Sequence, residues 1–386
     1  MVNSLGAGAF TALTINFIPV VARRLDADPL LLSIILAAPF AGSVLNVFSG
    51  YWLPRHNRLR FAAVAIGFAR GLLFLTPLAT GPLSFTLLAV LLYLLIAVPN
   101  PIFMEVLRGM YPAEKRARLL SITRIGMTAA ITVGSLVGGS MLDNWGPAVL
   151  FPLGALLGLV SAGAYSRIRV QEVEVQRFGT SAAFGLLRED RAFAAYTFAM
   201  ILWGFGLFMF GPFQPLMLVD RLHASYTEVG VLGFVSSAFW LLSYFYWGRS
   251  VDRLGATRVM AISHLLTVLT PLLYWLSPSV WLLVPAAAAM GIANGGIDLA
   301  GINAILRLAP PSQVPRYTAL INTLLGFRGM VAPFVGSALA AQAWFGFDGV
   351  AILCILFICA GATLMRTVAL EPVIAPPIRT PPVSSD

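Results

Sequence analysis

Charged residues are scarce in this sequence, at 11% of the chain against 59% hydrophobic residues. A soluble domain usually carries about 25% charged residues, so this composition excludes an ordinary soluble protein. The mean hydropathy of +0.86 indicates that lipid is the solvent for most of the chain. Its 386 residues leave room for about twelve spans of ~20 residues and little else.

Cysteine and histidine are also rare, with two and three residues. Cys354 and Cys359 lie in one apolar run at a spacing that points them to different faces of a helix, so we expect neither a disulfide nor a metal site. The sequence has no H-E-x-x-H motif, no G-x-S-x-G motif and no Gly-rich phosphate loop with a lysine. We therefore predict a protein that is not an enzyme and that uses no cofactor.

The apolar runs between charged or Pro/Gly-rich breaks predict twelve helical spans. Arg23 and Arg24 follow the first run in place of a small-residue cleavage site, which favours a retained span over a removable signal peptide. The predicted spans lie near residues 5–22, 30–53, 61–79, 84–107, 119–142, 147–166, 192–218, 227–248, 258–277, 279–304, 317–341 and 348–368.

The formal charge of +9 is explained by topology rather than by a nucleic-acid partner. When both termini are placed in the cytoplasm, most of the 25 Lys and Arg residues fall on the cytoplasmic side, as the positive-inside rule requires. The exceptions are three residues on the other side and three inside spans, namely Arg23, Arg24, Arg221, Arg70, Arg124 and Arg328. We expect a multi-pass protein of the cytoplasmic (plasma) membrane that contacts lipid and binds no nucleic acid.

One long internal loop divides the chain into halves. A Pro-rich tail follows the last span, and its composition cannot bury a core, so we expect it to be disordered. The predicted organisation is an N-terminal six-helix bundle at 1–166, a cytoplasmic loop at 167–191, a C-terminal six-helix bundle at 192–370 and the tail at 371–386.

An internal repeat relates the two halves at an offset of 198 positions, the distance from Gly50 to Gly248. Several coincidences at one offset favour duplication of a six-span unit over chance. The superimposed pairs are Gly50 with Gly248, Arg55 with Arg253, Arg60 with Arg258, Arg118 with Arg316, and Gly138 with Gly336.

After the eighth predicted span the sequence reads Gly-Arg-Ser-Val-Asp-Arg-Leu-Gly-Ala-Thr-Arg from Gly248 to Arg258. This stretch resembles the G-x-x-x-D-R-x-G signature of the major facilitator superfamily. The matching loop after the second span keeps Gly50 and Arg55 but has Pro54 in place of the acid. The resemblance implies an all-α integral membrane protein of twelve transmembrane helices, in two six-helix bundles related by a pseudo-two-fold axis, with the substrate site between them near the bilayer midplane.

By the same resemblance, the signature residues form a latch that holds the cytoplasmic side closed in one state. Its first glycine allows close helix packing, and its second permits a tight turn between spans. The alternative is that the charges only mark a cytoplasmic turn. The implied latch residues are Gly248, Asp252, Arg253, Gly255, Arg258 and Arg316, with Gly50 and Arg55 as the altered copy.

Small residues in the fifth and eleventh spans favour export over import. The fifth span keeps the glycines of the G-P-x-x-G motif that many exporters of the family carry, but lacks its proline. The eleventh span instead has Pro333 between Gly329 and Gly336. Small residues at this spacing let helices approach closely and bend.

Charges inside spans cost about 3 kcal/mol each on insertion scales, so each one is a functional hypothesis. Glu105 and Arg124 lie at similar depth on either side of one loop and are expected to pair. Asp298 and Arg328 lie deeper, again at matching depth. Asp298 is the leading candidate for a protonatable coupling site, with Arg328 as its modulator or as an anion contact. The alternative is a static pair between helices.

Polar and aromatic residues of the spans that line the central cavity in the family complete the candidate set. Four amides can orient a substrate or join helices, and the aromatic seventh span can line a pocket for an apolar or amphipathic substrate, although some of its rings must face lipid. These residues are Asn16, Asn100, Gln214, Asn294, Trp203 and Phe210.

We therefore predict a monomeric secondary transporter that works by alternating access, with a small-molecule substrate and protons as the coupling ion. The expected direction is export of an apolar or amphipathic compound. The open alternatives are an importer or a lipid flippase of the same fold, and a membrane sensor or assembly protein that does not transport.

Overall fold

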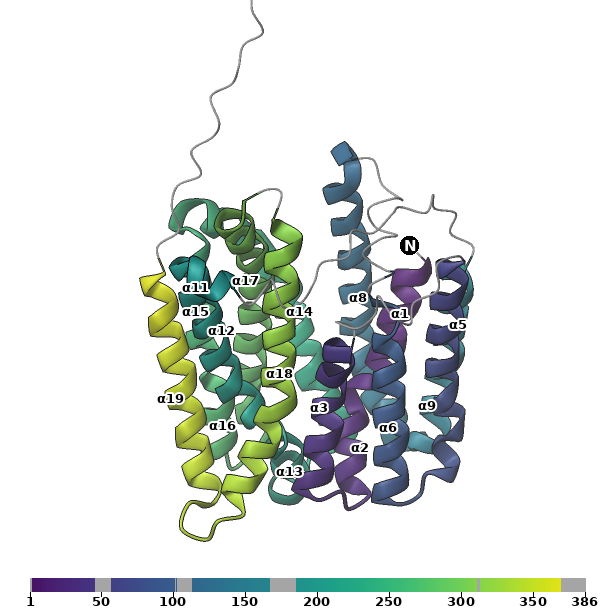
Figure 1. The fold of residues 1–386 in the computed structure, drawn as a ribbon. Helices are drawn as coiled ribbons and strands as arrows, with labels where there is room; N and C mark the ends of the chain where they lie inside the picture. The colour runs from purple at the N-terminus through teal and green to yellow at the C-terminus, as the bar shows by residue number, and fades with distance from the viewer. Residues whose placement is uncertain are drawn as a thin grey trace, which may run out of the picture.

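The computed structural model describes residues 2–45, 57–100, 102, 113–166, 185–310 and 313–368. The described chain is almost entirely helical, and its helices stand side by side in two groups, purple to blue and green to yellow in Figure 1. Ten helical stretches of this part of the chain are long and apolar enough to cross a membrane. Two shorter apolar helices, Pro29–Leu45 and Pro82–Ala97, stand where the second and fourth spans are predicted.

The N-terminal bundle contains the first six spans. Its first span is broken into three pieces, and its third ends in a 3-10 helix. Gly146, at a positive φ of 72°, separates the fifth span from the sixth. The elements are α1 (Val2–Leu13), η1 (Ile15–Phe17), α2 (Ile18–Arg24), α3 (Pro29–Leu45), α5 (Arg58–Gly71), η3 (Leu72–Leu78), α6 (Pro82–Ala97), α8 (Ala113–Trp145) and α9 (Pro147–Ser166).

The C-terminal bundle repeats this plan after a short helix, α11 (Leu186–Glu189). Its first span is again broken into three pieces, of which the last is a turn of π-helix. The elements are α12 (Arg191–Met209), α13 (Phe213–Leu216), η4 (Met217–Arg221), α14 (Tyr226–Leu254), α15 (Ala256–Leu266), α16 (Leu269–Leu276), η5 (Val280–Leu283), α17 (Val284–Leu308), α18 (Val314–Ala340) and α19 (Gly346–Thr367).

The repeat predicted from the sequence is confirmed by the elements themselves. At the offset of 198 positions, α9 overlaps α19, α8 overlaps α18, and α5 overlaps α15. The break in the first span, at η1, coincides with the break in the seventh, at α13. The two bundles therefore share both their helices and their irregularities.

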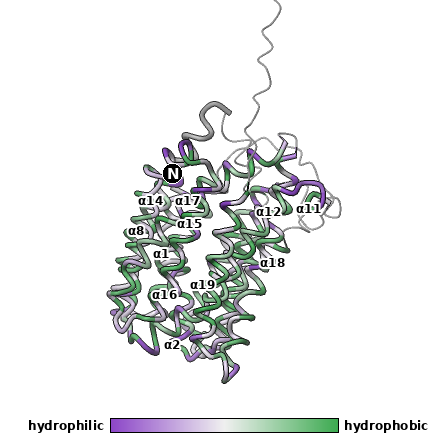
Figure 2. Tube along the Cα trace, turned by 90° about the vertical axis from the view of Figure 1, so that its left-hand side faces the viewer, coloured by the Kyte–Doolittle hydropathy of each residue, from purple (hydrophilic) through white to green (hydrophobic). Residues whose placement is uncertain are grey.

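The outer surface of the bundles is apolar. Large hydrophobic side chains such as Val64, Leu87 and Phe245 are more than half exposed. Figure 2 shows that hydrophobic residues dominate the middle of the molecule, while hydrophilic ones gather toward its two ends. A lipid environment accounts for this arrangement, because water would not favour such exposed apolar area.

Several predicted boundaries differ from the structure by a few residues, and two of the differences concern the signature stretch and the central loop. The helix α14 continues to Leu254, so Gly248 and Asp252 lie on the helix rather than in a loop, and the turn is the single residue Gly255. Residues 186–189 form α11 within the predicted 167–191 loop, and Asp190 then caps α12 by accepting a hydrogen bond from the amide of Phe193 (2.8 Å). Residues 167–184 and the tail from 369 lie outside the described residues.

The bundles meet along two pairs of helices, α8 with α14 and α3 with α18. Glycines make the first contact close, since a Cβ on Gly139 would lie 2.4 Å from the carbonyl oxygen of Tyr226, and one on Gly230 would lie 2.5 Å from that of Ser135. In the second pair, the hydroxyls of Ser33 and Ser337 lie 2.8 Å apart. These contacts belong to the end of the molecule that carries the short connections 25–28, 222–225 and 341–345, called the short-loop end below.

Candidate functional site

Asp298 on α17 pairs with Arg124 on α8, at 3.2 Å between Oδ2 and Nη1. The expected pair of Asp298 with Arg328 is therefore wrong. Equal depth in the membrane made the pairing plausible, but Arg328 on α18 points into the C-terminal bundle and donates to the carbonyl of Met200. Glu105, the expected partner of Arg124, lies outside the described residues.

The ion pair between Arg124 and Asp298 joins the two bundles. The hydroxyl of Tyr244 on α14 also donates to Asp298 Oδ2, at 2.8 Å. The two charged side chains are 63% and 31% exposed, so the pair is solvated and contributes at most about 1 kcal/mol. A pair of this strength can break and re-form as the bundles move.

Tyr244 is a site residue that sequence reasoning missed. It lies in the predicted eighth span, where an aromatic residue is unremarkable in this composition. Its distance of 54 positions from Asp298 gives no local signal of contact. Only a helical-wheel comparison of the eighth and tenth spans would have indicated that Tyr244 and Asp298 lie on facing sides of their helices.

Arg328 is nearly buried, with 6% of its surface exposed. Its guanidinium carbon lies 5.6 Å from the ring centre of Trp203 and 5.0 Å from that of Phe208. Aromatic faces stabilise a desolvated cation, which offsets part of the cost of burial. Gly204 makes room for this group, since a Cβ there would lie 2.0 Å from Arg328 Nη1.

Trp203 and Phe210 were expected to line a substrate pocket, but both are buried inside the C-terminal bundle. Trp203 stacks on His264 at 4.3 Å between ring centres and donates to Thr267 Oγ1 (3.0 Å). Phe210 is fully buried against Phe213 and the rings of neighbouring helices. These residues therefore belong to the core of the C-terminal bundle.

The breaks in the first and seventh spans each carry an amide side chain. Asn16 in η1 is exposed and donates to Ser135 Oγ at 3.2 Å. Gln214 in α13 is half-buried, lies 198 positions later and lines a cavity described below. The repeat thus places one uncharged polar group at each break, where helix irregularity exposes backbone polar groups to a ligand.

The other two amides lie on the spans expected to line the central space. Asn100 is exposed and Asn294 is half-buried. Asn100 is the repeat counterpart of Asp298, so the amide of one bundle stands where the other has its acid. No described residue forms a hydrogen bond with either side-chain amide.

The residues of the expected latch lie at the arginine-rich end, opposite the short-loop end. Asp252, Arg253 and Arg258 are exposed, and Asp252 forms no ion pair with another described residue. Gly255 has a φ of 85°, which confirms the expected tight turn. A Cβ added at Gly248 would meet no atom within 4 Å among the described residues, so the close packing expected there is wrong. Gly50 and Arg55 lie outside the described residues, and Arg316 donates to Gln313 at 3.4 Å.

At the short-loop end the bundles are tied by polar contacts. Asp143 at the end of α8 accepts from the backbone amides of Tyr226 and Thr227 at 2.9 and 2.7 Å, so one bundle caps a helix of the other. Arg23 pairs with Asp220 at 2.9 Å, and Arg24 lies 3.7 Å from the ring centre of Tyr226. This end is closed in the conformation described.

A family model described as Major Facilitator Superfamily matches residues 1–217 and again 196–383. The chain belongs to the major facilitator superfamily. It is therefore a multi-pass membrane protein with the fold of a transporter. The two matches, one per bundle, agree with the repeat. No curated protein sequence matches the chain.

Solved structures of similar fold include the nucleoside transporter NupG, with a TM-score of 0.73 and 14% identity over 95% of this chain and 98% of that one. A bacterial homologue of the iron transporter ferroportin, in an inward-facing state, has a TM-score of 0.68 and 16% identity over 95% and 96%. A bacterial homologue of the lysosomal transporter Spinster, inward-facing and unoccupied, has a TM-score of 0.60 and 17% identity over 95% and 93%. At such identities the likeness concerns the fold alone.

Proposed function

We propose that the protein is a proton-coupled secondary transporter that exports an uncharged apolar or amphipathic compound across the cytoplasmic membrane by alternating access. The observation that carries the proposal is the ion pair of Arg124 with Asp298, which joins two bundles that are otherwise tied at the opposite end. A charge pair between bundles makes the surroundings of Asp298 depend on how the bundles are arranged.

Protonation of Asp298 is the proposed coupling step. In the arrangement described, Arg124 and Tyr244 both contact the carboxylate. In the proposed cycle, movement of the bundles relative to each other separates Asp298 from Arg124 and opens the carboxylate to exchange a proton. A proton can then be taken up in one arrangement and released in the other.

The orientation of the protein follows from its basic residues. The arginine-rich end is assigned to the cytoplasm, with both termini there, and the short-loop end to the opposite side. The conformation described is then closed to the outside. Two of the similar solved structures are in inward-facing states, which is consistent with this assignment.

The substrate class and the direction rest on the residues near the breaks and in the fifth span. Asn16, Gln214 and Asn294 offer hydrogen bonds without charge, which suits an uncharged compound. Gly134 and Gly139 on α8 make close contacts with Ala12 and Tyr226, the small-residue packing that resembles exporters of the family. We further propose that the protein acts as a monomer.

The proposal is tested by reconstituting the protein in proteoliposomes with an imposed pH gradient and following an uncharged amphipathic dye, Nile red, and labelled uridine as a polar comparison. The wild type should move the dye against its gradient only when the proton gradient favours export. Asp298→Asn should lose this accumulation, while exchange of the dye without a pH gradient stays within about three-fold, because a permanently neutral residue cannot couple protons to movement.

The matched control is Asp26→Asn, which removes an exposed carboxylate at the short-loop end from a residue with a φ of 65° that asparagine tolerates. It should behave as the wild type. Gradient-driven accumulation by Asp298→Asn at every pH would refute the coupling role. Accumulation of uridine in the opposite direction would replace export by import, and no flux of any probe would favour a protein that does not transport.

A further inference from the structure

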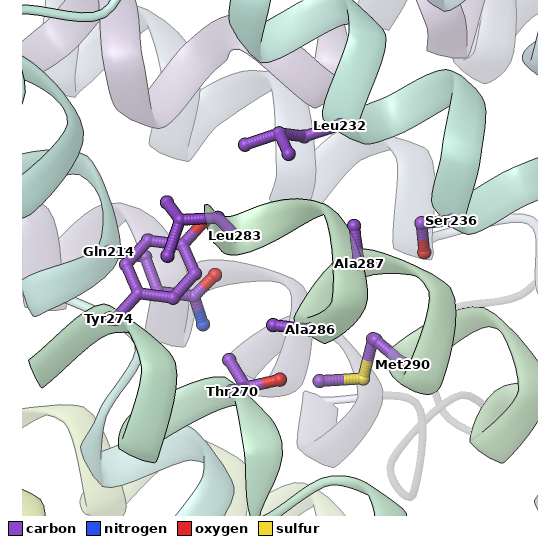
Figure 3. A pocket seen from close by; sticks show the side chains of 9 residues that line it. All are labelled: Gln214, Leu232, Ser236, Thr270, Tyr274, Leu283, Ala286, Ala287 and Met290. Carbon is purple, nitrogen blue, oxygen red and sulfur yellow. The ribbon is translucent and has the colours of Figure 1, made fainter. Parts of the chain in front are cut away.

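The C-terminal bundle contains a partly open cavity of about 140 Å³, lined by residues of α13, α14, α16, η5 and α17. Figure 3 shows side chains from these elements around one space, with the ring of Tyr274 on one side and Met290 on another. The lining residues are Gln214, Leu232, Ser236, Thr270, Tyr274, Leu283, Ala286, Ala287 and Met290.

The repeat shows how the lining of this cavity differs from the corresponding positions of the other bundle. At three corresponding positions of the N-terminal bundle, 198 residues earlier, the side chains are larger. Leu88 corresponds to Ala286, Leu72 to Thr270 and Phe85 to Leu283. All three are at least nine-tenths buried. The C-terminal bundle thus has smaller side chains at three lining positions, while Tyr274 and Gln214 are larger than their counterparts Thr76 and Asn16.

The polar groups of the cavity lack protein partners. The side chains of Gln214, Ser236, Thr270 and Tyr274 form no hydrogen bond with any described residue. Thr270 and Tyr274 are more than nine-tenths buried. The four groups face one space without a protein partner, so each is available to hydrogen-bond a ligand there. In the N-terminal bundle, the counterpart of Tyr274 is Thr76, whose hydroxyl donates to the carbonyl of Leu73 (2.7 Å).

We propose that this cavity is a binding site for the uncharged ring of a phenol-like or heteroaromatic compound, and that it receives one end of the transported molecule. The second part rests on the proposed function. A cavity of about 150 Å³ holds one benzene molecule, which sets the size of the bound group. None of the described residues that line the space is charged, and burying an ionised group without a partner is costly, so the ligand is neutral.

The lining matches such a ring on its faces and on its edge. Leu232, Leu283 and Met290 supply apolar contact, and a thioether interacts favourably with an aromatic ring. Gln214 provides both a donor and an acceptor, and the hydroxyl of Tyr274 can serve as either. A ring with a hydroxyl or a ring nitrogen satisfies these groups, whereas a purely hydrocarbon ring leaves them unpaired.

Binding is tested with 4-fluorophenol and the full-length protein in nanodiscs, by ¹⁹F NMR line broadening against empty nanodiscs. The wild type should bind 4-fluorophenol more tightly than fluorobenzene and should not bind 4-fluorobenzoate. Ala286→Leu, which copies Leu88 of the other bundle, should lower the affinity at least about ten-fold by filling the cavity. Tyr274→Phe should lower it about two- to ten-fold, the range for one hydrogen bond.

The matched control is Ala288→Leu, which adds the same atoms to a half-buried residue of α17 outside the cavity. It should bind 4-fluorophenol as the wild type does. Equal binding by Ala286→Leu and the wild type, or equal binding of fluorobenzene and 4-fluorophenol, would refute the site and leave ordered water as its occupant. Because binding is measured at equilibrium without a gradient, a failed transport assay would leave this result intact, and the reverse also holds.

Discussion

Arg328 shows how a single charge is accommodated inside the membrane. The guanidinium is 6% exposed and lies against Trp203 and Phe208, with one hydrogen bond to the carbonyl of Met200. The missing side chain of Gly204 is what leaves room for it. Arg328 has no carboxylate partner among the described residues. The aromatic faces stabilise its charge, and the lack of a Cβ at Gly204 leaves space for the guanidinium.

Gly204→Ala should destabilise the protein by about 1–3 kcal/mol, because its Cβ would lie 2.0 Å from Arg328 Nη1 and the buried guanidinium must shift. Thermal unfolding of the purified protein, followed by tryptophan fluorescence, measures the effect. Gly163→Ala is the control, since Gly163 is exposed and a Cβ there meets no atom within 4 Å. Adding Arg328→Met to Gly204→Ala should recover much of the loss, and an unchanged melting temperature for Gly204→Ala alone would contradict the steric account.

At the scale of helices, α14 depends on a cap from the other bundle. Its own Ser225 and Glu228 form a capping box, and Asp143 of α8 accepts two further amides. The cap thus stabilises α14 and also links the two bundles at the short-loop end. Any motion that opens this end must expose those amides.

Asp143→Ala should shift the conformational equilibrium toward opening at the short-loop end by about five-fold, because a lost cap is worth about 1 kcal/mol. Spin labels at Leu83→Cys and Ala343→Cys, with both native cysteines replaced, report the separation of the bundles at this end by double electron–electron resonance. The population of long distances should increase.

Asn144→Ala provides the neighbouring control, since Asn144 donates within its own helix to Ser140 at 2.8 Å. Its distance distribution should match that of the wild type. A distribution for Asp143→Ala that also matches the wild type would mean that the cap stabilises α14 alone and takes no part in closure.

At the scale of the whole molecule, alternating access requires the bundles to separate at the short-loop end in every cycle. Ser33 of α3 and Ser337 of α18 bring the bundles together there, with their hydroxyls 2.8 Å apart and both side chains buried. The contact is between repeats rather than within one. A covalent link at this point tests the rocking motion directly.

Ser33→Cys combined with Ser337→Cys, in a chain with Cys354 and Cys359 replaced by Ala, should form a disulfide on oxidation, because the side chains already touch. Oxidation should stop transport in proteoliposomes, and reduction should restore it. Ser33→Cys alone controls for the oxidant. Full transport by the cross-linked protein would show that the bundles do not need to part at this contact.

Much of the fold could be predicted from the sequence because the bilayer imposes local rules. Runs of apolar residues must be helices of a set length, and Gly255 marks a turn since it takes a φ that other residues avoid. The repeat then fixed the pairing of spans into two bundles. Helix ends were harder to predict. The helix α14 continues beyond its apolar run to Leu254, because polar residues such as Asp252 remain helical outside the lipid.

The site was only partly predictable, because depth along a helix does not determine direction around it. Asp298 and Arg328 share a depth, yet they face different neighbours, and Tyr244 and Arg124 complete the group around the acid. Composition and apolar runs thus predicted a membrane protein of twelve spans, and the internal repeat with the family resemblance of residues 248–258 predicted its two bundles. Which charges meet, which end is closed and where the C-terminal bundle leaves a cavity were decided by the tertiary structure, since they depend on the packing of side chains from distant helices.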